Sequence, residues 1–201
     1  MGMRNPRSLV ACRPPPGAAM TRLTPRFGRK DWLDLGLTLL ARHGPEAMTL
    51  EKLTEAAKKT RGSFYHHFAD HQDFLAAIGA RWRETSTEGP IAAIEARREK
   101  RSQSLARRTA DIDHALERNL RRLAASEPVV AREVKRVDEV RIRYLVMLFR
   151  SELGLSPAEA LARARIQHAY FVGAQMVFPE ADRAFRLRLQ KTLGDTLWRA
   201  G

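Results

Sequence analysis

Apolar residues recur along this chain at the spacing of an α-helix from about residue 29 to the end. The first such stripe covers residues 29–43 and contains Trp32 and Leu40. The Gly44 and Pro45 that follow it are typical of a helix end. No segment alternates apolar and polar residues with the two-residue period of a half-buried strand. The pattern therefore predicts an all-α protein of about nine helices.

Three short helices are predicted next, each behind a residue whose side chain can cap it. Thr49 precedes residues 50–57, Thr60 precedes residues 61–68, and Asp70 precedes a further apolar helical stretch. Ser, Thr and Asp at such positions accept hydrogen bonds from the free N–H groups of a first helical turn. Four helices are thus expected before residue 85, where the rhythm changes.

Longer helices are predicted after residue 85. A polar, Arg-rich stretch lies at residues 97–108, and the apolar run at residues 144–149 should be buried on most sides. Ser156 opens the best-marked helix, because Pro and Glu stand at its first and third positions. This helix should run to about Val177, and a last one follows Pro179.

Composition narrows the class of protein. The chain has 201 residues, 44% of them hydrophobic, and no apolar run of the length that a membrane span needs. Its single cysteine, Cys12, cannot form an internal disulfide, so we expect a cytoplasmic protein. The net charge of +13 favours a polyanionic partner such as nucleic acid. The excess is shared between residues 1–87 and 88–201, so charge alone does not locate the site.

Residues 60–71, TRGSFYHHFADH, combine aromatic residues with three histidines and admit several interpretations. A metal site is one, since His67 and His71 are four residues apart, but Ala69 and Asp70 should break the helix between them and no further ligand completes a zinc set. Catalysis is another, but the chain has no nucleophile elbow, phosphate loop or dinucleotide fingerprint. We therefore expect no metal, no cofactor and no enzymatic activity.

The third interpretation is a helix-turn-helix formed by residues 49–68. A short helix, a turn of three or four residues and a second capped helix make up that motif, whose second helix enters the DNA major groove. Phe64 and Phe68 are four residues apart and would anchor the second helix. Gly62 is unfavourable inside a helix, and close approach of the backbone to DNA is one reason for it; an irregular turn is the other.

These residues resemble a known family. The stretches 53–57 (LTEAA), 60–68 (TRGSFYHHF) and 73–75 (DFL) are similar to the DNA-binding domain of the tetracycline-repressor (TetR) family, and the resemblance covers residues 27–82. It implies a homodimeric regulator, usually a repressor, that binds a palindromic DNA operator and releases it when a small-molecule effector binds the C-terminal domain. The alternatives are a helical nucleic-acid-associated protein without a ligand switch and a helical enzyme.

The resemblance also implies roles for individual residues. Thr49 and Thr60 would cap helices that point at phosphates, Tyr65 would contact the backbone, and His67 would pack. The full set of expected DNA-binding residues is Thr49, Lys59, Thr60, Arg61, Gly62, Ser63, Tyr65, His66 and His71.

Two positions depart from the family pattern. Lys58 and Lys59 stand in the turn where a glycine and an apolar residue are common, so Lys58 implies strain or a slightly different turn. Lys59 would lie near phosphate or in solvent. His71 stands where a lysine is usual, and a phosphate contact from its ring would be strong only when the ring is protonated.

Three regions are expected: residues 1–26 as a disordered basic extension, residues 27–82 as the helix-turn-helix domain, and residues 83–201 as a helical ligand-binding and dimerisation domain. Arg22, Arg26, Arg29 and Lys30 form a basic arm that could add DNA contacts. The expected dimer interface is Ile166, Ala169, Tyr170, Gly173, Val177, Phe185, Leu189 and Leu193. The expected ligand pocket is His114, Tyr144, Met147, Phe149, His168 and Phe171.

Overall fold

The structure, a computed structural model, describes residues 27–97, 100–112 and 114–199, and it is all-α within them. The expected extension at residues 1–26, with Cys12, Arg22 and Arg26, lies outside the described residues. The helices are α1 (Arg29–His43), α2 (Leu50–Ala57), α3 (Arg61–Tyr65), α4 (His71–Arg83), α5 (Gly89–Glu95), α6 (Arg101–Asp111), α7 (His114–Ala124), α8 (Pro128–Leu153), α9 (Pro157–Val177) and α10 (Arg183–Leu197), with a 3-10 turn η1 (Pro45–Ala47) and a π-helical turn η2 (Glu84–Glu88). The all-α prediction is confirmed.

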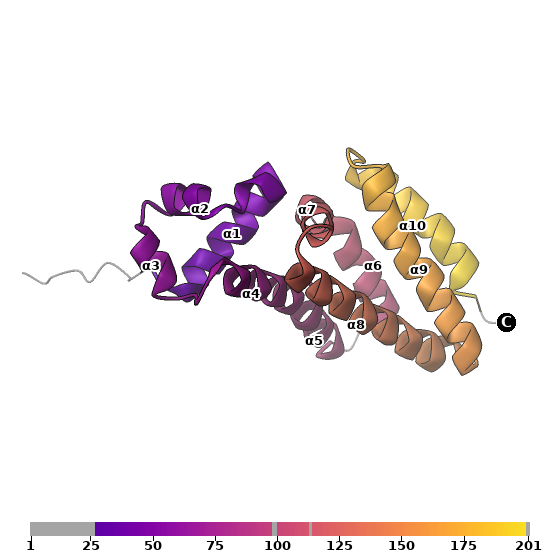
Figure 1. Ribbon diagram of the computed structural model, residues 1–201. Helices are drawn as coiled ribbons and strands as arrows, with labels where there is room; N and C mark the ends of the chain where they lie inside the picture. The colour runs from indigo at the N-terminus through magenta and orange to yellow at the C-terminus, as the bar shows by residue number, and fades with distance from the viewer. Residues whose placement is uncertain (1–26, 98–99, 113, 200–201) are drawn as a thin grey trace, which may run out of the picture.

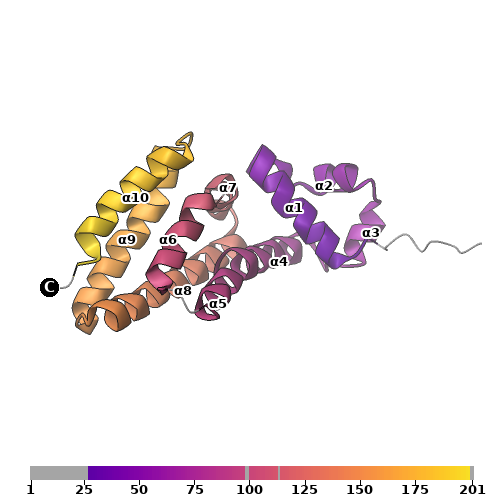
Figure 2. The same ribbon diagram turned by 180° about the vertical axis from the view of Figure 1, so that it is seen from behind.

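The helices lie along an elongated molecule. Helices α1, α2 and α3 form one end, α9 and α10 form the other, and α4 and α8 connect them through the middle (Figures 1 and 2). None of the helices described here is long and apolar enough to cross a membrane.

Local sequence signals set the helix starts as predicted. The Thr49 side chain accepts a hydrogen bond from the Lys52 N–H at 3.4 Å, and the Thr60 side chain accepts one from the Ser63 N–H at 3.2 Å. Asp70 accepts one from the Asp73 N–H at 2.7 Å, so each cap satisfies one backbone donor that the helix itself leaves free.

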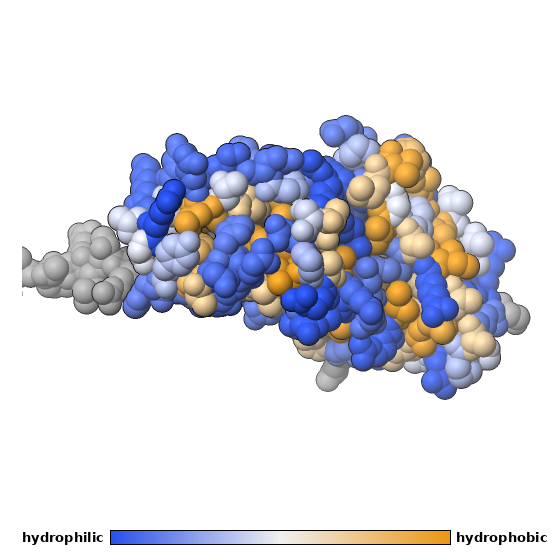
Figure 3. Space-filling view, viewed as in Figure 1, coloured by the Kyte–Doolittle hydropathy of each residue, from blue (hydrophilic) through white to orange (hydrophobic). Residues whose placement is uncertain are grey.

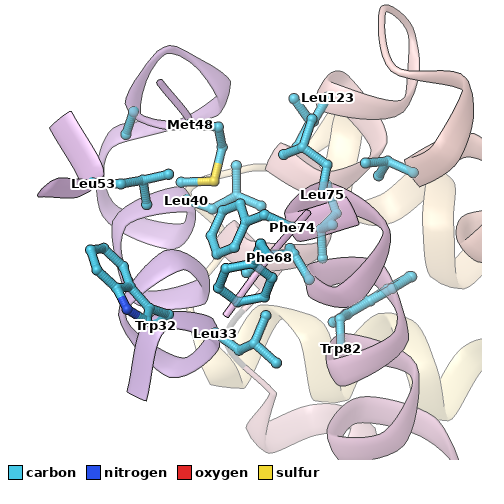
Figure 4. Close-up of a cluster of buried hydrophobic side chains, with 14 of the residues drawn as sticks. Trp32, Leu33, Leu40, Met48, Leu53, Phe68, Phe74, Leu75, Trp82 and Leu123 are labelled. Carbon is cyan, nitrogen blue, oxygen red and sulfur yellow. The ribbon is translucent and has the colours of Figure 1, made fainter. Parts of the chain in front are cut away.

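One buried cluster joins the helix-turn-helix to the middle of the molecule. Trp32 of α1, Leu53 of α2, Phe74 of α4 and Leu123 of α7 all belong to it, and it continues into the first half of α8 (Figure 4). Burial of such side chains stabilises a fold by about 1.5 to 3 kcal/mol each. Helix α4 is thus held on one side by α1, α2 and α3 and on the other by the C-terminal helices.

Gly79 shows how closely α4 and α8 approach. A Cβ atom at this position would lie 2.8 Å from both Cβ and Cγ of Glu133 in α8, a distance that real side chains do not reach. Glu133 is itself buried and receives a hydrogen bond from Nε of Arg83 at 3.0 Å. The crossing of the two helices therefore depends on a residue without a side chain.

Candidate functional site

The turn between α2 and α3 has the strained geometry that was one of the two outcomes expected for Lys58. Lys58 adopts the left-handed conformation, with φ 51° and ψ 43°. Its N–H bonds to the Glu55 carbonyl, and the next N–H, of Lys59, bonds back to the Thr54 carbonyl, both at 3.0 Å. This is a Schellman ending, normally made with glycine, and the lysine costs on the order of 1 to 2 kcal/mol.

Aromatic rings fix α3 against the other helices. Phe64 is fully buried, and its ring lies 5.4 Å from Trp32 of α1 and 5.2 Å from Phe74 of α4. Phe68, just after α3, is 1% exposed and packs 5.0 Å from the ring of Phe74. These contacts set the rotation of α3, so its opposite side faces outward.

The outward side of α3 carries the residues that the resemblance implies. Arg61, Gly62 and His66 are exposed, Tyr65 is 51% exposed, and Ser63 is half-buried. A Cβ atom at Gly62 would meet only the Oγ1 of Thr60, at an ordinary 3.7 Å. Gly62 lies inside α3 rather than in an irregular turn, and the described packing does not require a glycine there.

His71 is held by the protein backbone. It is half-buried at the start of α4, and its Nε2 lies 2.6 Å from the carbonyl oxygen of Met48. Because a carbonyl only accepts, Nε2 must carry a proton and donate it. A phosphate contact from this ring would therefore have to use Nδ1.

The other two histidines differ from each other. His66 is exposed, whereas His67 is half-buried, with its ring 6.5 Å from that of Phe68. No group of three His, Cys, Asp or Glu side chains that could hold a metal ion occurs within the described ranges.

Of the expected basic arm, Arg29 lies over the Phe68 ring and pairs with Asp73 at 3.8 Å, and Lys30 pairs with Asp34.

A cavity of about 810 Å³ lies in the C-terminal half, bordered by η2, α5 to α10 and the segments that join them. Four of the expected pocket residues line it: His114, Tyr144, His168 and Phe171. Met147 and Phe149 do not line it, so that part of the expected set needs correcting. Phe149 is fully buried with its ring 4.3 Å from that of Trp198, and Met147 packs against the cluster of Ile94, Tyr144 and Leu148.

The expected interface residues divide into two groups. The first group lines the cavity: Tyr170 of α9, and Phe185, Leu189 and Leu193 of α10. Helix α10 packs alongside α6, where the Gln190 amide donates to the Ala106 carbonyl at 3.0 Å. Ile166 and Val177 are 52% and 67% exposed, Ala169 is exposed, and Gly173 has open space around it. Apolar side chains gather on this side of α9 (Figure 3).

A buried charge network lies beside the cavity, and the sequence analysis missed it. Glu117 of α7 is 2% exposed and accepts hydrogen bonds from Arg141 at 2.7 and 2.9 Å and from Arg121 at 2.9 Å. Arg121 also donates to Asp138 at 2.6 Å, and Nε2 of His168 lies 2.9 Å from the same carboxylate. The sequence did contain a signal for a buried charge: Glu117 stands three residues before Leu120 and so falls on the buried side of α7.

Charge pairing sets the protonation of this network. Burial raises the pKa of the Asp138 carboxyl, but the hydrogen bonds from His168 and Arg121 outweigh it and hold that pKa well below its ordinary value. Burial acts the same way on Glu117, and Arg141 and Arg121 together bring its pKa below the ordinary value. Both carboxylates are therefore ionised at neutral pH.

Arg141 connects the cavity wall to the end of α4. Its Nε donates to the Thr87 hydroxyl of η2 at 3.1 Å, and its guanidinium lies 5.5 Å from the Trp82 ring of α4 and 5.3 Å from the Phe171 ring of α9. Arg141, Thr87 and Phe171 line the cavity, whereas Trp82 belongs to the core under the helix-turn-helix. One side chain thus contacts both the cavity wall and the core under the helix-turn-helix.

Comparison with known proteins agrees with this geometry. Residues 33–78 match the model of the family described as bacterial regulatory proteins, tetR family. The HTH-type transcriptional repressor AcnR of Corynebacterium efficiens is 32% identical over 74 residues, which cover 35% of this chain and 39% of the relative; its counterpart in Corynebacterium glutamicum is 31% identical over the same length. The match thus spans about two fifths of the length of these curated relatives.

Solved structures share the fold over most of the chain. Reduced E. coli NemR superposes with a TM-score of 0.71 at 18% identity, covering 86% of this chain and 97% of NemR. A TetR-family regulator from Agrobacterium tumefaciens superposes with a TM-score of 0.64 at 16% identity, covering 84% of this chain and 96% of that one. At these identities the likeness concerns the fold.

Proposed function

We propose that this chain is a TetR-type transcriptional repressor that binds a palindromic DNA operator and releases it when a small-molecule effector enters the C-terminal cavity. The match of residues 33–78 to the tetR family model and the 32% identity to the repressor AcnR over 74 residues support this proposal. The family is one of DNA-binding regulators and not of enzymes. The observation that carries the proposal is the outward side of α3, where a polar, glycine-containing surface is presented on a helix fixed by buried aromatic rings.

The proposed DNA contacts fall into two kinds. Arg61 and Ser63 lie in the first turn of α3, the part of a recognition helix that reaches base edges, and Gly62 lets the backbone approach. His66 directly follows the helix on the same exposed surface. The start of α2 at Thr49, the start of α3 at Thr60, and Lys59, Tyr65 and His71 would lie against phosphates. Thr49, Thr60 and Lys59 are exposed, as such contacts need.

A dimer would match the two half-sites of a palindromic operator. Two α3 helices must lie about one helical turn of DNA apart, roughly 34 to 36 Å, to read two half-sites. We propose that α9 and α10 pack against the same helices of a second copy, because the large exposed apolar side chains of the described C-terminal half, Ile166, Met176, Val177 and Phe178, lie on or directly after α9.

The proposed release mechanism uses the contacts of α4. This helix begins at the helix-turn-helix and ends at Trp82 and Arg83, beside Arg141 and the cavity. An effector that displaces Phe171 or Thr87 changes the surroundings of Arg141 and hence the packing of the α4 end. A shift of α4 alters the separation of the two α3 helices in a dimer, which weakens binding to a fixed operator spacing.

Selection of duplexes from random DNA tests the proposal. The expected result is enrichment of an inverted repeat, with Arg61→Ala abolishing the enrichment and Arg132→Ala, an exposed arginine on α8, leaving it intact. Binding without an enriched symmetric sequence would support the alternative, a helical nucleic-acid-associated protein without an operator. No DNA binding at all would contradict both.

A further inference from the structure

The cavity has an apolar body. Ile91 and Ile94 of α5, Leu105 of α6, Leu145 of α8 and Leu189 of α10 form much of its wall. Its volume of about 810 Å³ lies within the range of sites that enclose small organic molecules, roughly 300 to 1,000 Å³. An apolar ligand part of considerable size is therefore accommodated.

The charged side chains of the wall are almost all basic. Nine lysines and arginines line the cavity, against one acidic residue among those described, Asp195, which is paired with Lys191 at 2.7 Å. The charge of Arg141 is taken up by Glu117. Arg118 of α7, by contrast, donates only to the Pro179 carbonyl at 3.4 Å and has no carboxylate partner among the described residues.

Among the described residues, two buried polar atoms of the cavity lining, in neighbouring side chains, have no hydrogen bond of normal geometry. His114, the first residue of α7, is 9% exposed, and its Nδ1 has none. Gln175 of α9 is 5% exposed; its amide N–H donates to the Phe171 carbonyl at 3.1 Å, but its Oε1 has no partner. Buried polar atoms without partners are costly and uncommon, and here both belong to residues that line the cavity.

The protonation state of His114 should depend on the charge of a bound ligand. Burial lowers the pKa of its imidazole, and the positive charges of Arg186 on α10 and Arg118 on its own helix lower it further, against the opposing effect of Glu117 and the nearby Gln175 amide. The neutral form of the ring is therefore favoured at pH 7. A negative charge brought beside it favours protonation, after which both ring nitrogens donate, enough for Oε1 of Gln175 and for one ligand oxygen.

We propose that the cavity binds an amphipathic organic anion, with its apolar part between α5, α6 and α10 and its acidic group against His114, Gln175 and Arg118. This ligand class rests on the proposed effector-responsive function and narrows it. A lipophilic cation would face the basic wall without a counter-charge, and a wholly apolar ligand would leave Arg118 without an anionic partner among the described residues.

Calorimetric titration of the full chain, without DNA, tests the ligand class. The probes are decanoate, 1-decanol and decylammonium, which share an alkyl chain and differ in charge, with 2-naphthoate and 2-naphthylmethanol as an aromatic pair. The expected result is binding of at least one acid about tenfold more tightly than its uncharged or cationic counterparts, the difference that one or two charge-assisted hydrogen bonds supply. Equal or tighter binding of the alcohol or amine overturns the proposal, as does no binding of either acid.

Variants locate the acidic group. Arg118→Gln and His114→Gln should each weaken acid binding by about tenfold without changing alcohol binding, whereas Arg143→Gln, an exposed arginine of α8 outside the cavity, should change neither. Equal losses for acid and alcohol in both variants overturn the proposed placement. Operator selection is measured separately: selection of a palindrome with no acid binding refutes only the ligand class, and acid binding with no operator refutes only the proposed repressor function.

Discussion

Replacing Arg141 by methionine should destabilise the protein far more than the same change at Arg143, two residues along α8. The Arg141 side chain is 12% exposed and the side chain of its partner Glu117 is 3% exposed, whereas Arg143 is exposed to solvent. Breaking a buried ion pair from one side typically costs 3 to 5 kcal/mol, because the remaining charge stays buried. Arg121 still bonds Glu117 at 2.9 Å, so we expect the lower end, about 3 kcal/mol.

Thermal unfolding at fixed protein concentration measures the difference. For a chain of this size, about 3 kcal/mol corresponds to a midpoint lowered by roughly 6 to 12 °C. Adding Glu117→Leu to Arg141→Met should recover at least half of the loss, because the buried carboxylate that has lost one of its two arginine partners is then removed and Arg121 keeps Asp138. Midpoints of Arg141→Met and Arg143→Met that agree within about 2 °C would refute the reasoning, and so would additive losses in the double variant.

Three further outcomes are expected. Lys58→Gly should stabilise the protein by about 1 kcal/mol in urea unfolding, since glycine adopts the left-handed conformation without strain; a loss of stability would show that Lys58 is not strained. Asp138→Asn should reduce acid sensitivity: the folded pKa of Asp138 lies below its unfolded value, so its stabilisation is present above about pH 4 and lost as the pH falls. Wild type and variant with parallel stability profiles between pH 5 and pH 3, about one unit either side of that value, would contradict this. If α9 forms the proposed dimer interface, Val177→Glu should shift the sedimenting species from dimer to monomer, and an unchanged dimer would place the interface elsewhere.

The helix-turn-helix end was largely predictable from sequence because its signals are local. Capping by Thr49 and Thr60 depends on residues three positions away, and the spacing of Phe64 and Phe68 is enough to define the buried side of α3. Even the strain at Lys58 could be anticipated, since a turn of that length needs a left-handed residue.

The cavity was less predictable because its lining depends on how distant helices pack. In the apolar run of residues 144–149, Tyr144 faces the cavity whereas Phe149 is covered by Trp198, and no spacing rule separates the two. The same holds for Leu189 and Leu193, which were expected at an interface and line the cavity in the described chain. One partner of Glu117, Arg121, is four residues away on the same helix, but the other, Arg141, is 24 residues away on α8, so only the packing of the two helices brings it to Glu117.

The crossing of α4 and α8 at Gly79 and Glu133 has a consequence for engineering. A hybrid that joins the helix-turn-helix end of another protein of this fold to the C-terminal helices of this one would have to preserve this crossing. If the α4 of the other protein carries a side chain at the position of Gly79, that side chain would collide with Glu133 of this chain. A functional hybrid would have to inherit the two residues as a pair, on opposite sides of the join.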